Sequence, residues 1–112
     1  MPKPEDEVVV VAHFTARQGK EGELLKLLYG LLEPTRKKAG CIRYELNQEI
    51  ENPSAFTVAE KFASREAFDA HVKMPYVARF GEQLAALVES KHIRLHRELL
   101  PVSQSGGSTR HA

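Results

Sequence analysis

Two polar residues near the middle of the chain are of types that could do acid–base chemistry. Residues 55–63 alternate as a strand, and Glu60 falls between Val58 and Phe62 on the face that should be buried. A buried carboxylate is costly unless it is paired or functional. His71 follows on a short helical segment whose period points it toward the same sheet. A Glu60–His71 pair would satisfy both, although an inward histidine is more often a hydrogen-bonded core residue than a catalyst.

Aromatic side chains from two other segments are expected near this pair. Tyr44 lies on the strand before Glu60 and should face it across a β-hairpin. Tyr76 and Phe80, on the helix that Pro75 begins, are placed to wall the same hollow. Each is individually compatible with an ordinary core position, so only their convergence indicates a site.

Other reactive residues carry little signal. The chain contains five histidines and a single cysteine. His92 and His96 share one face of a predicted strand about 13 Å apart, too far for one ion, so we expect no metal site. Cys41 follows a glycine with no second thiol nearby and is best explained as a small buried residue. Glycine-rich phosphate loops, zinc motifs and the G-x-S-x-G elbow do not occur.

The hydrophobic periods predict the elements that would position these residues. Residues 8–16 indicate a strand, and a leucine stripe from Leu24 to Leu32 predicts a helix that Pro34 should kink or restart and that Gly40 should end. A hairpin is predicted over 41–50 and 55–63, then helices from Ser64 and Pro75 and a last strand over 91–99. The order β-α-β-β-α-β predicts an α+β, ferredoxin-like fold with an antiparallel sheet covered by helices on one face.

The first strand is apolar on both faces. Val9 and Val11 alternate with Val8 and Val10, whereas a sheet with one wet face should show polar residues at every second position. Its second face therefore needs cover, and a second copy of the chain, sheet against sheet, is the simplest cover. We expect a homodimer.

Composition narrows the class of protein further. At 112 residues and a formal charge of +1, the chain has room for one domain and no electrostatic pull toward nucleic acid. No run approaches the ~20 apolar residues that cross a bilayer, and a lone thiol suits a reducing, cytoplasmic compartment. We expect an N-terminal extension over 1–7, the domain over 8–101 and a disordered tail over 102–112, where no large apolar residue could anchor the chain.

Several phrases of the sequence resemble the antibiotic biosynthesis monooxygenase family, which includes quinol monooxygenases. They run from about Val8 to Leu99, and the spacing of Glu60, Phe62, Ser64 and His71 is the most specific of them. The matching strings are VVVVAHFTARQGKEGEL at 8–24, LLEPTRKKAG at 31–40, GCIRYEL at 40–46, PSAF at 53–56, EKFASREAFDAH at 60–71 and MPY at 74–76. The resemblance implies a dimeric α+β barrel with a pocket between sheet and helices.

Within that family the resemblance favours oxygenation of a small quinol or phenol by O2 without flavin, haem or metal. The haem-degrading branch has an asparagine and a tryptophan where this chain has Ala12 and Phe62, and only His71 matches. A branch acting on phosphorylated sugars would need a cationic pocket, which the sequence does not locate.

The resemblance implies His71 as the base that deprotonates the substrate, Glu60 as the residue that orients it, and Tyr44 or Tyr76 as donor to the oxyanion. The ring would be packed by the aromatic residues Phe14, Phe62, Tyr76 and Phe80. Two alternatives stay open: a small-ligand-binding protein without catalysis, and a cofactor-free isomerase or lyase acting on a small carbonyl compound.

Overall fold

A computed structural model of the chain describes residues 6–38 and 40–99. Within them the elements follow the order β-α-β-β-α-α-β. The predicted tail, 102–112, and most of the predicted N-terminal extension lie outside the described residues. No described helix is long and apolar enough to span a membrane.

The sheet has four antiparallel strands in the spatial order β2-β3-β1-β4, as expected of a ferredoxin-like fold. Its bounds are β1 Val8–Ala16, β2 Cys41–Gln48, β3 Ala55–Phe62 and β4 Val88–His96. Of the two central strands, β1 and β3, β3 carries the alternating burial that the sequence predicted: Phe56, Val58, Glu60 and Phe62 all turn toward the helices.

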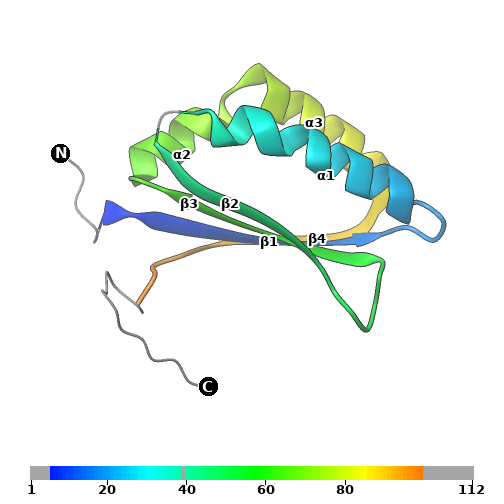
Figure 1. Ribbon diagram of the computed structural model, residues 1–112. Helices are drawn as coiled ribbons and strands as arrows, with labels where there is room; N and C mark the ends of the chain where they lie inside the picture. The colour runs from blue at the N-terminus through cyan, green and yellow to red at the C-terminus, as the bar shows by residue number, and fades with distance from the viewer. Residues whose placement is uncertain (1–5, 39, 100–112) are drawn as a thin grey trace.

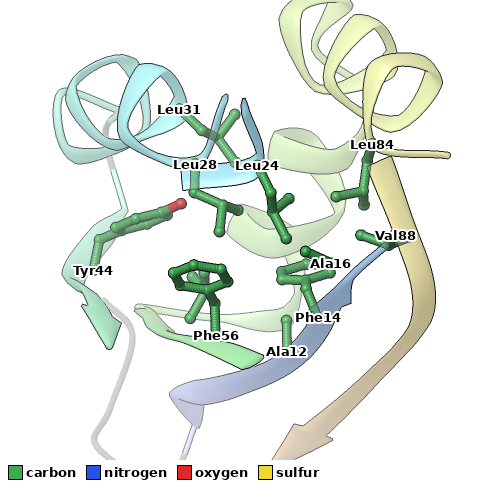
Figure 2. Packing of buried hydrophobic residues seen from close by; sticks show 11 residues of the cluster. Ala12, Phe14, Ala16, Leu24, Leu28, Leu31, Tyr44, Phe56, Leu84 and Val88 are labelled. Atoms are coloured by element: carbon green, nitrogen blue, oxygen red, sulfur yellow. The ribbon is translucent and has the colours of Figure 1, made fainter. Parts of the chain in front are cut away.

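Three helices cover one face of this sheet, and the other face is open (Figure 1). They are α1 Glu21–Arg36, α2 Arg65–Val72 and α3 Pro75–Leu87. The predicted leucine stripe of α1 reaches the core, where Leu24 and Leu28 are fully buried. Pro34 does not restart the helix, because it lies in the last turn, where few backbone bonds remain to be lost. Figure 2 shows α1 leucines, Tyr44 and Phe56 converging between the layers.

Two expectations for the edge strands were wrong in detail. Ile42, which a regularly alternating strand would turn inward with Tyr44, is about half exposed, because the β2–β3 register shifts between Cys41 and Arg43 and leaves Ile42 as the unpaired residue. The last strand begins at Val88 rather than Lys91 and ends at His96. Val88 continues the apolar period of α3, which hid the boundary, but its backbone is already extended.

β1 is apolar on both of its faces, but the helices cover only one of them. Val10, Ala12, Phe14 and Ala16 are buried under the helices, whereas Val9 and Val11 face the other way and stay partly exposed. The second face of β1 is therefore partly apolar and uncovered in a single copy of the chain, and its cover by a second copy stays a prediction.

Candidate functional site

A small cavity lies between the helix layer and the sheet. Its volume is about 110 Å³, and its walls come from β1, β2, β3 and β4 below and from α1, α2 and α3 above. The lining is mainly apolar, with Tyr44, Glu60 and His71 as its polar members. The remaining lining residues are Val10, Ala12, Phe14, Leu31, Val58, Phe68, Val72, Val77, Phe80 and Ile93.

Glu60 enters the cavity from the centre of the sheet. Its position on β3 is opposite Val10 of β1 and Tyr44 of β2. Burial of the carboxylate raises the pKa of Glu60 to about 7, because the charged form loses its water. Among the described residues its Oε1 atom has no hydrogen-bond partner. The carboxyl group is thus poised to change charge near neutral pH.

His71 approaches Glu60 from the last turn of α2. Its ring is 5% exposed, and its Nε2 atom lies 3.8 Å from Oε1 of Glu60, close but longer than a hydrogen bond. Burial lowers the pKa of His71, and the nearby positive charge of Lys38 lowers it further. The imidazole is therefore held neutral at pH 7 and able to accept a proton.

The other side of the imidazole is held by a short hydrogen-bonded chain. The Tyr76 hydroxyl lies 3.4 Å from Nδ1 of His71 and 3.2 Å from Oγ1 of Thr35 on α1. Phe62 stacks against the ring at 5.1 Å between centroids. These contacts leave the ring little freedom and direct Nε2 toward the cavity.

The local sequence explains why α2 carries His71 to this place. The Ser64 side chain accepts a hydrogen bond from the backbone N–H of Ala67 and so caps the helix, as predicted. Gly40 has a φ of +91°, and a Cβ on it would lie 2.8 Å from the Cβ of Ala67. Only glycine lets the chain turn and lets α2 pack this close.

Tyr44 supplies a hydroxyl to the cavity from β2. The side chain is 1% exposed, and its hydroxyl has no hydrogen-bond partner among the described residues. Burial, and then the charge of Glu60, raise the pKa of Tyr44 well above its usual range, so the phenol stays protonated. Figure 2 shows its ring extending from β2 beneath α1 into the core. A buried hydroxyl without a partner is a donor available to a ligand.

The predicted aromatic residues divide into two groups. Phe14 and Phe80 line the cavity and meet edge to face, with centroids 6.3 Å apart. Phe62 lies behind His71 and does not line the cavity. Tyr76 lines a separate groove on the outer side and reaches the site through His71, by its hydroxyl and by an edge-to-face ring contact with centroids 6.0 Å apart.

Sequence reasoning missed two contributors. Thr35 is fully buried at the inner end of α1, and Ile93 brings β4 into the cavity wall. Thr35 follows Pro34, at a position where the sequence marks the end of a helix and gives no sign of a polar contact. Within the described residues, no group of three or more His, Cys, Asp or Glu side chains could hold a metal ion.

Two curated proteins are similar to the chain over most of its length. It is 30% identical over 81 residues, 72% of the chain and 79% of the relative, to Rv0793 of Mycobacterium tuberculosis, provisionally named a monooxygenase. It is 29% identical over 79 residues to an uncharacterized Synechocystis protein, sll1783. That match covers 70% of this chain but only 54% of the longer Synechocystis protein.

Solved structures give the same fold. SO0527 of Shewanella oneidensis superimposes with a TM-score of 0.81 at 37% identity, covering 84% of this chain and 92% of that one. SnoaB of Streptomyces nogalater, described as a cofactor-independent oxygenase, superimposes with a TM-score of 0.76 at 21% identity, covering 87% and 99%. The second likeness shows the fold alone.

A family model agrees with these likenesses and covers most of the folded part. The model described as "Antibiotic biosynthesis monooxygenase" matches residues 7–83, which include every polar residue of the cavity. The chain therefore belongs to the antibiotic biosynthesis monooxygenase family.

Proposed function

We propose that this protein is a cofactor-independent monooxygenase that oxidises a small quinol or phenol with O2. The observation that carries the proposal is the convergence of His71, Glu60 and the unpaired Tyr44 hydroxyl on one apolar cavity. Membership of the family supports oxygenation, as does the provisional naming of the 30%-identical relative Rv0793 as a monooxygenase.

In this proposal His71 is the base. When the Tyr76 hydroxyl donates to Thr35, it accepts from Nδ1–H of His71, and Nε2 then carries the free lone pair. Nε2 faces the cavity and takes the proton of the substrate hydroxyl. Glu60, with a pKa of about 7, is partly ionised at neutral pH, and its carboxylate form stabilises the positive charge of the imidazolium.

Tyr44 is the better placed of the two tyrosines to stabilise the substrate oxyanion. The Tyr76 hydroxyl is already engaged with His71 and Thr35, whereas the Tyr44 hydroxyl has no described partner and belongs to a residue that lines the cavity. A phenol has a pKa near 10, so transfer to a histidine is uphill unless the resulting anion is hydrogen-bonded. Tyr44 supplies that bond.

The oxygen chemistry needs no outside reductant. A deprotonated quinol is electron-rich enough to pass an electron to O2, and recombination forms the new carbon–oxygen bond. One quinol and one O2 then give one hydroxyquinone and one water, with all four electrons coming from the substrate. The phenyl groups of Phe14 and Phe80 exclude bulk water from the reacting ring.

The open sheet face supports a homodimer as part of the same proposal. Val9 and Val11 lie on this face partly exposed, and a second copy related by two-fold symmetry would bury them between the two sheets. The helices lie on the opposite side of the sheet (Figure 1). A partner on the open face would therefore leave the cavity and the outer groove uncovered. A cytoplasmic location remains our prediction from the single cysteine.

The test is quinol-dependent oxygen uptake by the purified protein, measured over a panel of one-ring and two-ring quinols against autoxidation. We expect uptake above background, reduced roughly a hundredfold or more in His71→Ala, because a positioned general base contributes about that much. Lys73→Ala, which removes an exposed side chain just after α2 and away from the open sheet face, is the control and should keep wild-type uptake.

The outcomes separate the alternatives. Ligand binding without oxygen uptake, unaffected by His71→Ala, would indicate that the protein binds a small ligand and is not an oxygenase. Product formation in the absence of oxygen would indicate the isomerase or lyase. Uptake that is the same in His71→Ala and the wild type would remove the base from the mechanism.

A further inference from the structure

A second, larger hollow lies on the outer side of the helix layer. It is an open groove of about 570 Å³ between α1 and α3, which run side by side above the sheet (Figure 1). Glu23, Lys26, Leu27, Gly30, Leu31 and Pro34 of α1 form one wall of it. The other wall is formed by Tyr76, Arg79, Phe80, Gln83 and Leu87 of α3.

The groove and the cavity share a wall. Leu31 and Phe80 line both hollows, so these two side chains stand between them. Tyr76 lines the groove while its hydroxyl contacts Nδ1 of His71 at the cavity. A molecule that displaced Phe80 would therefore extend from the cavity directly into the groove.

The cavity alone is too small for most aromatic molecules. A protein cavity of about 150 Å³ admits benzene, whereas this one measures about 110 Å³. A single ring enters only if the lining yields, and a substrate with any substituent must project through the wall. Leu31 and Phe80 form the wall between the cavity and the larger groove, so such a substituent would pass between them.

The charged residues of the groove indicate which chemical group the projecting part of the substrate carries. Lys26 and Arg79 line the groove from opposite helices, both side chains are exposed, and neither forms an ion pair within the described residues. Glu23, the acidic residue of the lining, is engaged by Lys20 at 3.2 Å. Lys26 and Arg79 are therefore both available to pair with an anionic group of a ligand.

We propose that the α1–α3 groove binds an anionic substituent of the same aromatic substrate whose ring occupies the cavity. The inference rests on the proposed function, because it assumes a ring beside His71 and Glu60. It assigns Lys26 and Arg79 to substrate recognition and defines the substrate as a phenol or quinol with an acidic side chain.

Calorimetric titration with two probes tests this without turnover. Para-propylphenol and para-hydroxyphenylpropanoate share the ring and the three-carbon arm, and only the second ends in a carboxylate. We expect the carboxylate to bind the wild type about tenfold more tightly, since each exposed ion pair contributes a few-fold in affinity. Arg79→Gln and Lys26→Gln should each lower that advantage about threefold and leave the affinity of the neutral probe unchanged.

Lys37→Gln is the matched control, because Lys37 is an exposed cation that follows α1 and lies outside the groove. Equal affinity of the two probes, or an advantage that is unchanged in both Arg79→Gln and Lys26→Gln, would contradict the proposal that the groove binds the anionic substituent. The proposal that the cavity binds the ring would be unaffected. Failure of both probes to bind rejects the cavity as a phenol site and the groove inference with it.

Discussion

Histidines occur on both sides of the sheet, in opposite surroundings. His71 lies under the helices, 5% exposed, beside the carboxyl of Glu60 and against the ring of Phe62. His13 and His92 pair across β1 and β4 on the open face, exposed, with ring centroids 6.2 Å apart. One side chain has lost its water and has its pKa lowered, whereas the other two have not been buried.

The comparison teaches that burial, and not residue type, separates the candidate site from the rest of the surface. The covered face combines Glu60, His71 and Tyr44 with apolar walls, so small electrostatic differences decide which group holds a proton. The open face combines histidines with Val9 and Val11, a mixture that suits contact with another protein surface. We therefore expect substitutions on the two faces to change different measurements.

The largest effect should come from charging the open face. Val11→Lys would place a lysine on β1 directly opposite Arg94 of β4, and a two-fold interface would contain it twice. Losing the burial of a valine costs about 1.5–3 kcal/mol per copy, so the dimer should dissociate about a thousandfold more readily. Sedimentation equilibrium measures this. Ile50→Lys, at a 92% exposed position in the hairpin loop, is the control.

A wild-type protein that is already monomeric at high concentration would contradict the dimer. A Val11→Lys protein that dimerises as the wild type does would place the interface elsewhere.

The next effect tests the covered face through the pH dependence of stability. The pKa of Glu60 rises from 4.5 to about 7 on folding, so its contribution is present at low pH and is lost as pH rises through about 7. A shift of this size corresponds to roughly 3 kcal/mol. Glu60→Gln mimics the neutral form. Relative to the wild type, its free energy of unfolding should increase by about that amount between about pH 4 and pH 9.

Urea titrations at several pH values measure the difference, and the contribution of His71 cancels to first order because both proteins contain it. Glu45→Gln, an exposed carboxylate on β2, should show no such trend. A wild type and Glu60→Gln that stay parallel across the range would mean that Glu60 is not desolvated.

The same contrast explains how much could be predicted from sequence. Alternation placed Glu60 on the buried face of β3 and His71 toward the sheet, because period alone decides which face a residue occupies. It did not distinguish Phe62, which stacks behind His71, from Phe14, which lines the cavity. Both are buried, and only the packing of α2 and α3 tells them apart.

The sequence also failed to predict the orientation of an edge-strand residue and the contacts between residues far apart in the chain. Ile42 alternates correctly in sequence, but a one-residue shift against β3 turned it outward. The Thr35–Tyr76 contact joins residues 41 positions apart, and it depends on how α1 and α3 pack rather than on any local pattern. Local periods carry no information about such pairs.

The smallest effect sharpens the role of Tyr44, because activity and stability should move in opposite directions. Tyr44→Phe removes a donor to the oxyanion, and we expect kcat for quinol oxidation to fall by about a hundredfold at most. It also removes a buried hydroxyl that has no described partner, which should raise the free energy of unfolding by about 1 kcal/mol. Tyr29→Phe, at a tyrosine that is 59% exposed on α1, should change neither. A Tyr44→Phe protein that loses stability together with activity would mean that the hydroxyl is satisfied in the folded protein, and that its place in the mechanism is structural support rather than contact with the substrate.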